Sequence, residues 1–277
     1  MSTSFVFSPY VLSTGPAAVR RLHVLHDVYS PAGRRVLLQA GLDPGMKVAD
    51  FGCGVGVVSK MLAEMVGPMG HVTGIDINVG QLTEARELCR KAGFENTHFV
   101  EASAHQTGLP RNSFDLVYCR FLLLHLARPE DCLREMMDVL KPGGILVVED
   151  GDLTTAATEP TSAMNAFADL FPKLGLARGL NYSVSRDLFS MVTAAGFQRV
   201  NIEISQPGIT RGETRNFLKW SVDEAGPAMV QEGIISRAAL DQTLSEMQAV
   251  VENPSILILP PRMSLVWARK PRISDRP

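Results

Sequence analysis

The residues from Val48 to Gly56 read Val-Ala-Asp-Phe-Gly-Cys-Gly-Val-Gly, and a run with helical spacing follows from Val57 to Val66. The chain is therefore expected to form a short strand, a tight turn and a helix in direct succession. Glycine at alternate positions lets the backbone approach a ligand closely, and the amides at a helix start point toward that ligand. This feature predicts an α/β protein with a nucleotide-like cofactor, although glycine turns also serve plain strand-to-helix connections.

Two common nucleotide motifs do not fit this turn. A dinucleotide turn of the form Gly-x-Gly-x-x-Gly that starts at Gly52 needs glycine at position 57, where the chain has Val57. The Gly-Lys-Ser/Thr ending of a phosphate loop is also missing. What remains is Asp-x-Gly-x-Gly-x-Gly from Asp50, followed by a second apolar run that ends in Asp76. An acid there can accept from both ribose hydroxyls, or it can cap the next helix.

Together these features resemble the class I S-adenosylmethionine-dependent methyltransferases, over roughly residues 30 to 205. Residues 109–117 (Leu-Pro-Arg-Asn-Ser-Phe-Asp-Leu-Val) look like the lead into that family's fourth strand. Residues 140–148 (Leu-Lys-Pro-Gly-Gly-Ile-Leu-Val-Val) look like its turn into the fifth strand. The whole chain is similar to the bacterial small-molecule branch, which includes ubiquinone and menaquinone C-methyltransferase relatives.

Apolar runs alternate with helical periodicity along the chain, which predicts a parallel sheet covered by helices on both faces. Glycines at 93, 143, 144 and 196 are expected to end helices. The resemblance implies a Rossmann-like methyltransferase fold with seven strands, mostly parallel, in which the last strand is antiparallel between its neighbours. The expected strands are 47–51, 72–76, 97–101, 114–119, 144–149, 198–205 and 257–268, and the expected helices are 56–66, 79–92, 129–140 and 185–195.

The length of 277 residues suits a single domain with an added cap. Its core is expected at about 30–151, 185–206 and 255–270. Long connections usually form lids or caps, so segments 1–45, 152–184 and 207–254 are expected to form the cap, with a helix from Pro16 to Ala40. The first two segments should lie over the carboxyl ends of the strands, where ligands bind in open α/β sheets. The third should cover a sheet edge or contact a partner.

Composition excludes several other classes of protein. The formal charge of -2 gives no general attraction to nucleic acid. The four cysteines form no Cys-x-x-Cys pair, and the histidines make no metal-ligand spacing with acids, so neither a disulfide framework nor a metal is expected. The chain opens with no leader pattern and no apolar run approaches about 18 residues, so a cytoplasmic protein without a membrane span is expected.

The resemblance also implies which residues hold S-adenosylmethionine. Asp50 and the glycine turn are expected at the methionine portion, Asp76 at the ribose, and Ile77 with Gln81 beside the adenine. Ser103 stands where the family often has an acid, so its bond to the adenine amino group would carry no charge. The full expected set is Asp50, Gly52, Cys53, Gly54, Gly56, Asp76, Ile77, Gln81, Ser103, Ala104, Cys119 and Arg120.

Methyl transfer mainly requires a nucleophile held in line in a dry site, so no catalytic residue is strictly needed. A general base would help a hydroxyl acceptor, and His125 is the candidate, with a structural or cofactor-contacting role as the alternative. The acids at the end of the fifth strand either orient the acceptor or cap the chain's exit: Glu149, Asp150 and Asp152. Four aromatic residues either cover the acceptor or pack in the core: Tyr10, Tyr29, Tyr182 and Trp220.

The acceptor is expected to be a small, partly apolar molecule methylated on O, N or C. Enzymes of this superfamily that methylate nucleobase amines often carry Asn/Asp-Pro-Pro-aromatic after the fourth strand, whereas residues 118–121 are Tyr-Cys-Arg-Phe. Protein or RNA methylation is an alternative function. A third is a cofactor-binding or interaction module without catalysis. A homodimer is compatible with each of these.

Overall fold

The computed structural model describes residues 15–272. Tyr10 and the start of the first expected cap segment lie outside the described residues. The main sheet is formed by β1 (Lys47–Phe51), β2 (His71–Asp76), β3 (Thr97–Glu101), β4 (Phe114–Arg120), β5 (Leu140–Asp152), β7 (Gln198–Ser205) and β9 (Arg262–Arg269). Their order is β3-β2-β1-β4-β5-β9-β7, and β9 is antiparallel to both β5 and β7. The expected seven-stranded sheet with an inserted antiparallel strand is therefore confirmed.

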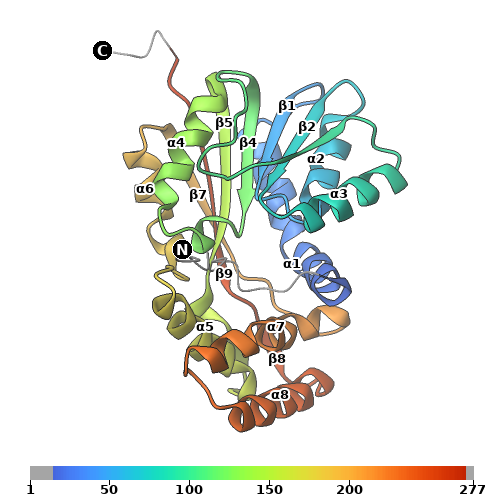
Figure 1. Cartoon of the computed structure of the whole chain (residues 1–277), viewed down its shortest axis with the longest axis vertical. Coiled ribbons are helices and arrows are strands. Elements are labelled where there is room, and N and C mark those ends of the chain that lie inside the picture. The colour runs from blue at the N-terminus through green and yellow to red at the C-terminus, as the bar shows by residue number, and fades with distance from the viewer. Residues whose placement is uncertain (1–14, 273–277) are drawn as a thin grey trace, which may run out of the picture.

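Helices cover both faces of this sheet. Leu116, Val117, Tyr118 and Cys119 of β4 are all fully buried, as expected for a parallel sheet with two covered faces. One face carries α1 (Pro16–Ala40), α2 (Val57–Val66) and α3 (Val79–Lys91), and the other carries α4 (Pro129–Val139) and α6 (Leu188–Ala194) (Figure 1). The structure thus has the layered α/β core that the alternating sequence pattern predicts.

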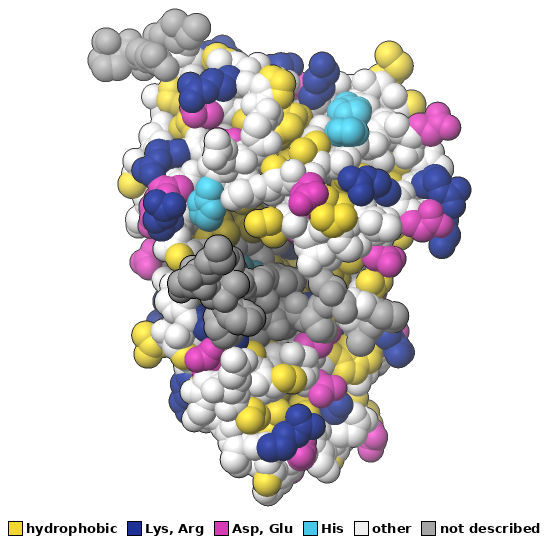
Figure 2. Space-filling model, viewed as in Figure 1, with side chains coloured by type: hydrophobic (Ala, Val, Ile, Leu, Met, Phe, Trp, Pro, Cys, Tyr) yellow, Lys and Arg dark blue, Asp and Glu magenta, His cyan; other side chains and the backbone are white. Residues whose placement is uncertain are grey.

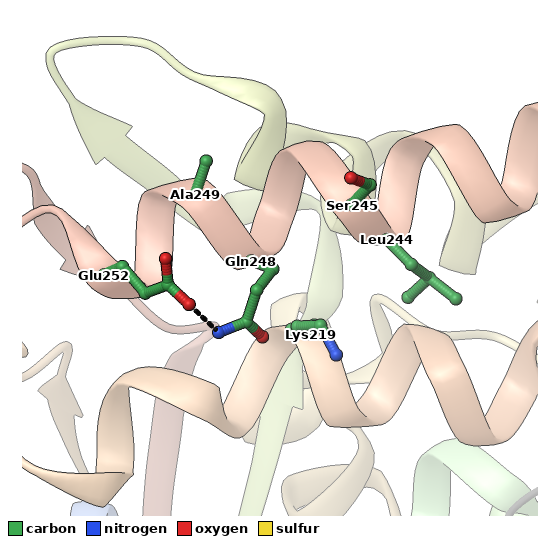
Figure 3. A pocket seen from close by; sticks show the side chains of 6 residues that line it. All are labelled: Lys219, Leu244, Ser245, Gln248, Ala249 and Glu252. Atoms are coloured by element: carbon green, nitrogen blue, oxygen red, sulfur yellow. Dashed lines mark hydrogen bonds between the residues drawn. The ribbon is translucent and has the colours of Figure 1, made fainter.

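A helical cap lies beyond one end of the sheet (Figure 1). It contains α5 (Ala166–Ala177), α7 (Phe217–Gln231) and α8 (Arg237–Glu252), and the first half of α1 packs against α7. A shallow hollow separates α7 from α8, where Gln248 Nε2 donates to Glu252 Oε1 at 2.7 Å (Figure 3). None of the helices in the described part of the chain is both long and apolar enough to cross a membrane.

The expected strand at 257–268 is wrong as a single element. It is divided into β8 (Leu257–Leu259) and β9, with Pro260 and Pro261 between them. Proline lacks a backbone donor and interrupts a sheet ladder, so the chain changes sheets at this point. β8 pairs in antiparallel fashion with β6 (Ala157–Glu159). This pairing connects the start of the cap segment 152–184 to the chain just after the cap segment 207–254.

The glycines expected to end helices behave in two ways. Gly93 and Gly196 follow α3 and α6 with φ of 80° and 91°, in the left-handed conformation typical of helix ends. The expectation for Gly143 and Gly144 is wrong, because α4 already ends at Val139 and Leu140 is extended. Leu140 pairs with Phe114 of β4, so sheet pairing begins before these glycines are reached.

Candidate active site

A cavity of about 540 Å³ lies between the carboxyl ends of the strands and the cap. Nine of the expected cofactor residues line it: Gly52, Cys53, Gly54, Asp76, Ile77, Gln81, Ser103, Ala104 and Arg120. The candidate base His125 also lines it, whereas Asp50, Gly56 and Cys119 do not. The cavity therefore gathers residues from the turns that follow four neighbouring strands.

The conformation of the turn after β1 requires glycine. Gly52, Gly54 and Gly56 have φ of 66°, 55° and 80°, a left-handed conformation that other residues rarely adopt. A Cβ at Gly52 would lie 2.8 Å from Leu122 Cδ1, which belongs to the cavity lining. A Cβ at Gly56 would lie 2.7 Å from Ala85 Cβ, so this glycine instead permits α2 to pack closely against α3. The two glycines thus serve the cavity and the core respectively.

Asp76 at the end of β2 holds the glycine turn in place. Its Oδ2 accepts from the Gly54 amide at 2.9 Å, and its Oδ1 accepts from the Asn78 amide at 2.9 Å. Burial raises the pKa of this carboxyl, while the amide hydrogen bonds lower it. A carboxylate oxygen accepts more than one hydrogen bond, so both oxygens keep capacity for the hydroxyls of a ribose. This arrangement fits the nucleoside part of S-adenosylmethionine.

The alternative role of Asp76 as a helix cap is taken by another residue. Asn78 is the N-cap of α3, and its side-chain oxygen accepts from the Gln81 amide at 3.0 Å. Asn78 also lines the cavity, although the sequence analysis did not select it. Its position immediately before a helix was the signal that could have identified it.

The loop after β3 supplies Ser103, Ala104 and His105. The Ser103 hydroxyl accepts from the His105 amide at 3.2 Å, and His105 Nε2 lies 3.2 Å from the Arg128 carbonyl oxygen. Serine here leaves the adenine end of the expected site without the acid that relatives often have. His105, which sequence alone places only in a loop, lines the cavity.

Asp50 lies beneath the glycine turn rather than in the cavity wall. Its side chain is buried and accepts from the Ser59 hydroxyl at 2.6 Å. Burial raises the pKa of Asp50 to about 7, and the Ser59 hydrogen bond opposes that shift. The bond to Ser59 links the end of β1 to α2, so Asp50 supports the turn from below.

Arg120 at the end of β4 contacts the first helix. Its Nη2 lies 3.1 Å from Nδ1 of His26 on α1. Burial and the neighbouring Arg120 charge lower the pKa of His26 to about 3. The His26 ring is therefore neutral near pH 7 and accepts from the guanidinium, which holds Arg120 at the cavity wall.

The acids at the end of β5 lie outside the cavity lining. Asp150 accepts from the amides of Leu123 and Leu124 at 2.8 and 3.3 Å, and burial raises its pKa to about 7. It thereby fixes the 3-10 turn Leu123–His125 that carries the candidate base. Asp152 accepts from the Thr154 hydroxyl at 2.6 Å and from Arg186 Nε at 2.6 Å, which holds the chain where it leaves the sheet.

His125 is half-buried in the cavity wall. Its ring meets Tyr182 edge to face, with 5.7 Å between the ring centroids. Burial, together with the charge of Arg21, lowers the pKa of His125 to about 3. The imidazole is therefore neutral at physiological pH. A base with so low a pKa draws a proton only weakly, so this environment disfavours proton removal by His125.

The cap supplies the other half of the cavity, as expected for its first two segments, through residues that the sequence pattern did not single out. Three described aromatic candidates, Tyr29, Tyr182 and Trp220, do not line it, and Tyr29 instead donates to the Pro261 carbonyl at 2.8 Å. All three cap segments contribute, including the third, which was expected at a sheet edge or partner contact. The cap residues in the wall are Arg21, Leu22, Leu25, Leu153, Phe167, Phe171, Phe217 and Ser221.

The sheet order, the glycine turn after β1 and the acid after β2 together define the class of S-adenosylmethionine-dependent methyltransferases. A family profile described as methyltransferase domain matches residues 42–186. The chain belongs to this methyltransferase family. It uses S-adenosylmethionine as methyl donor and a small molecule as acceptor, so the predicted enzyme class and cofactor are confirmed.

Relatives with assigned roles are found among bacteria. The ubiquinone/menaquinone biosynthesis C-methyltransferase of Pseudomonas fluorescens is 34% identical over 185 residues, which covers 61% of this chain and 72% of that protein. Its counterpart in Shewanella sediminis is 31% identical over 210 residues, or 67% of this chain and 82% of that protein. These similarities extend well beyond the glycine turn.

Solved structures share the fold. The YcgJ protein of Bacillus subtilis has a TM-score of 0.57 at 18% identity and covers 86% of this chain and 97% of its own. A Haemonchus contortus phosphoethanolamine N-methyltransferase has a TM-score of 0.56 at 16% identity, covering 92% of this chain and 53% of its own. At these identities the similarity concerns architecture alone.

Proposed function

We propose that this methyltransferase acts on a small, partly apolar acceptor that the cap holds beside the cofactor. The observation that carries the proposal is the division of the cavity into two halves. Polar groups and backbone at the strand ends form one half, around Asp76, and leucine and phenylalanine side chains of the cap form the other. In this proposal the core at about 30–151, 185–206 and 255–270 binds the cofactor, and the cap selects the acceptor.

When bound, S-adenosylmethionine supplies an electrophilic methyl group on a sulfonium. Asp76 would hold the ribose hydroxyls, the turn from Gly52 to Gly54 would lie against the methionine portion, and Ile77 with Gln81 would flank the adenine. The apolar cap side chains exclude water and restrict the acceptor to one side of the cavity. Proximity and orientation of this kind account for a large part of the barrier reduction in group transfer.

We assign His125 to the contact with the acceptor rather than to the cofactor. It lies on the turn that also contributes Leu122 and Leu124 to the cavity wall, and Asp150 fixes the backbone of that turn. Its neutral imidazole would orient the acceptor by a hydrogen bond. Proton removal by His125 would require the bound acceptor to raise its pKa.

We further propose that the enzyme works in the cytoplasm on free metabolites and has no nucleic-acid partner. Its four cysteines are buried free thiols, as is usual in reducing compartments. Basic and acidic side chains intermingle on the face shown in Figure 2, and the formal charge of the chain is -2. Such a surface offers little attraction to a phosphate backbone.

Two measurements test this function. Calorimetry should detect binding of S-adenosylhomocysteine, the demethylated product, to the purified full chain. Incubation with methyl-labelled S-adenosylmethionine and a bacterial metabolite extract should then place the label in a small molecule, as read by mass spectrometry. Label that appears only in protein or RNA fractions would support the macromolecular alternative. Cofactor binding without transfer to any fraction would support the non-catalytic module.

A further inference from the structure

The acceptor half of the cavity contains a buried cation, Arg21. It lies on α1 beside Leu22 and Leu25, and its side chain is only 2% exposed. Phe167 and Phe171 of α5 and Phe217 and Ser221 of α7 line the same cavity. A guanidinium in apolar surroundings needs partners, because an isolated buried charge is strongly unfavourable.

One nitrogen of the Arg21 guanidinium has a carboxylate partner, and another has no hydrogen-bond partner among the described residues. Arg21 Nε donates to Oε2 of Glu224 on α7 at 3.0 Å, and the Glu224 side chain is 9% exposed. Arg21 Nη2 is buried and has no hydrogen-bond partner among the described residues. An unsatisfied buried donor costs about 1–3 kcal/mol, and more when it is charged. Glu224 therefore fixes the orientation of a side chain that keeps a strong donor for another group.

The other polar groups of this half have a different character. The Ser221 hydroxyl donates to the Phe217 carbonyl at 2.8 Å, so its hydrogen is already used. His125 is neutral at physiological pH, as its pKa of about 3 indicates. Among the described cap residues that line the cavity, Arg21 is thus the one with a formal positive charge and a donor to offer. Its planar fork matches the oxygens of carboxylates and phenolates.

We propose that the methyl acceptor carries an oxygen anion, which binds Arg21 Nη2 while its apolar body lies against the phenylalanine side chains of the cap. Glu224 acts as a positioning residue for Arg21. This inference rests on the proposed function, because it takes the cap half of the cavity as the acceptor site. It narrows the acceptor from any small molecule to an apolar acid, either a carboxylate or a phenolate.

The competing explanation is that the Arg21–Glu224 pair only joins α1 to α7. The neighbouring pair Arg20–Glu213 also joins α1 to the cap, but it lies on the surface, with side chains 65% and 47% exposed. Arg20→Gln is therefore a matched control that removes a helix-to-cap ion pair without changing the cavity. Because Arg21→Gln leaves the Glu224 carboxylate buried without its partner, the double variant Arg21→Gln/Glu224→Gln is tested as well.

The experiment measures probe binding to the full chain saturated with S-adenosylhomocysteine, by calorimetry at pH 7.5. The carboxylate arm compares 2-naphthoate with its neutral isostere 2-naphthamide, and the phenolate arm compares 2,4-dinitrophenolate with 2,4-dinitroaniline. The native chain and Arg20→Gln should prefer the anion in at least one arm by about tenfold or more, as expected for a charge-assisted hydrogen bond. Arg21→Gln and the double variant should lose that preference.

Equal binding of anion and neutral probe by the native chain would overturn the proposal, as would a preference that survives in the folded Arg21 variants. The arm in which the preference appears identifies the kind of anion. Binding of S-adenosylhomocysteine, measured first in every sample, separates the two levels of inference. Its failure in the native chain contradicts the cofactor site, whereas normal cofactor binding without an anion preference contradicts only the role of Arg21.

Discussion

The carboxylate of Asp76 accepts a hydrogen bond from the backbone amide of Gly54, with 2.9 Å between Oδ2 and N. This bond connects the end of β2 to the turn that follows β1. Two parts of the expected cofactor site, the ribose acid and the glycine turn, are thus joined before any ligand binds. A substitution at Asp76 should therefore also change the conformation of the glycine turn, and a substitution in the turn should also displace Asp76.

Replacing Asp76 with asparagine should weaken binding of S-adenosylhomocysteine by at least about tenfold, because an uncharged amide offers weaker acceptors to hydroxyls and amides. Calorimetry on the purified variant measures this change. Glu101→Gln is the matched control, since Glu101 pairs with Asp76 in the sheet register at the end of β3 but is exposed. Native affinity in Asp76→Asn would contradict the assigned ribose contact.

Replacing Gly52 with alanine should abolish detectable cofactor binding. The left-handed backbone makes alanine less favourable by about 1–2 kcal/mol, and the new Cβ would lie 2.8 Å from Leu122 Cδ1 in the cavity wall. Gly45→Ala is the control, because Gly45 has φ of 84° and an added Cβ would meet nothing within 4 Å. Both variants should lose stability in urea unfolding, but only Gly52→Ala should lose the ligand. Equal affinities in the two variants would contradict this distinction.

Removing the Phe171 ring should destabilise the fold by about 3 kcal/mol, the usual scale for a buried phenylalanine changed to alanine. Phe171 is 4% exposed and packs against Phe167, with ring centroids 4.4 Å apart. Phe189→Ala on α6 is the control, since Phe189 is 43% exposed and should change the free energy of unfolding far less. Urea denaturation of both variants makes the comparison. Similar losses in the two variants would contradict the burial of Phe171 in the cap.

Glu149 gives a test of pH dependence. Burial raises its pKa from 4.5 to about 7, so between these values the folded chain binds a proton that the unfolded chain has released. The contribution of Glu149 to the free energy of unfolding is therefore fully present below pH 4.5, and it is lost as the pH rises toward about 7. Relative to Glu149→Gln, the native chain should lose unfolding free energy with a slope of up to about 1.4 kcal/mol per pH unit.

Urea unfolding of both proteins across this pH range measures the difference. The half-buried His26 and His125, whose pKa values are lowered, shift stability in the opposite sense, but they are present in both proteins and their contributions cancel. The exposed Glu84→Gln serves as control and should follow the native curve. Parallel curves for the native chain and Glu149→Gln would mean that Glu149 does not bind the extra proton.

Local pattern was sufficient to predict most of the core. The bounds of β1, β3, β7 and α1 agree with the expected ranges, because their ends coincide with polar, glycine or proline residues. Where pairing between distant segments decides the structure, the predictions were wrong. Leu140 leaves α4 because β4 offers it a partner, and β8 pairs with β6, which lies about a hundred residues earlier in the chain.

The candidate site divides in the same way. Residues of the glycine turn and Asp76 were predictable because one short stretch of sequence determines their geometry. Asp50 lies below the turn because it accepts a hydrogen bond from Ser59. The apolar periodicity of the sequence does not reveal such a bond. The acceptor half requires the packing of three separate cap segments, so no local pattern selects Arg21 over the exposed Arg20 next to it.

The pairing of β6 with β8 has a consequence for engineering. It ties the segment that carries α5 to the end of the segment that carries α7 and α8, so these two insertions form one wall of the acceptor half. A chimera that exchanges only one insertion with a relative would place a foreign strand edge against a native one. Acceptor preference should therefore be transplanted only when both insertions, together with the first half of α1, are exchanged as a set.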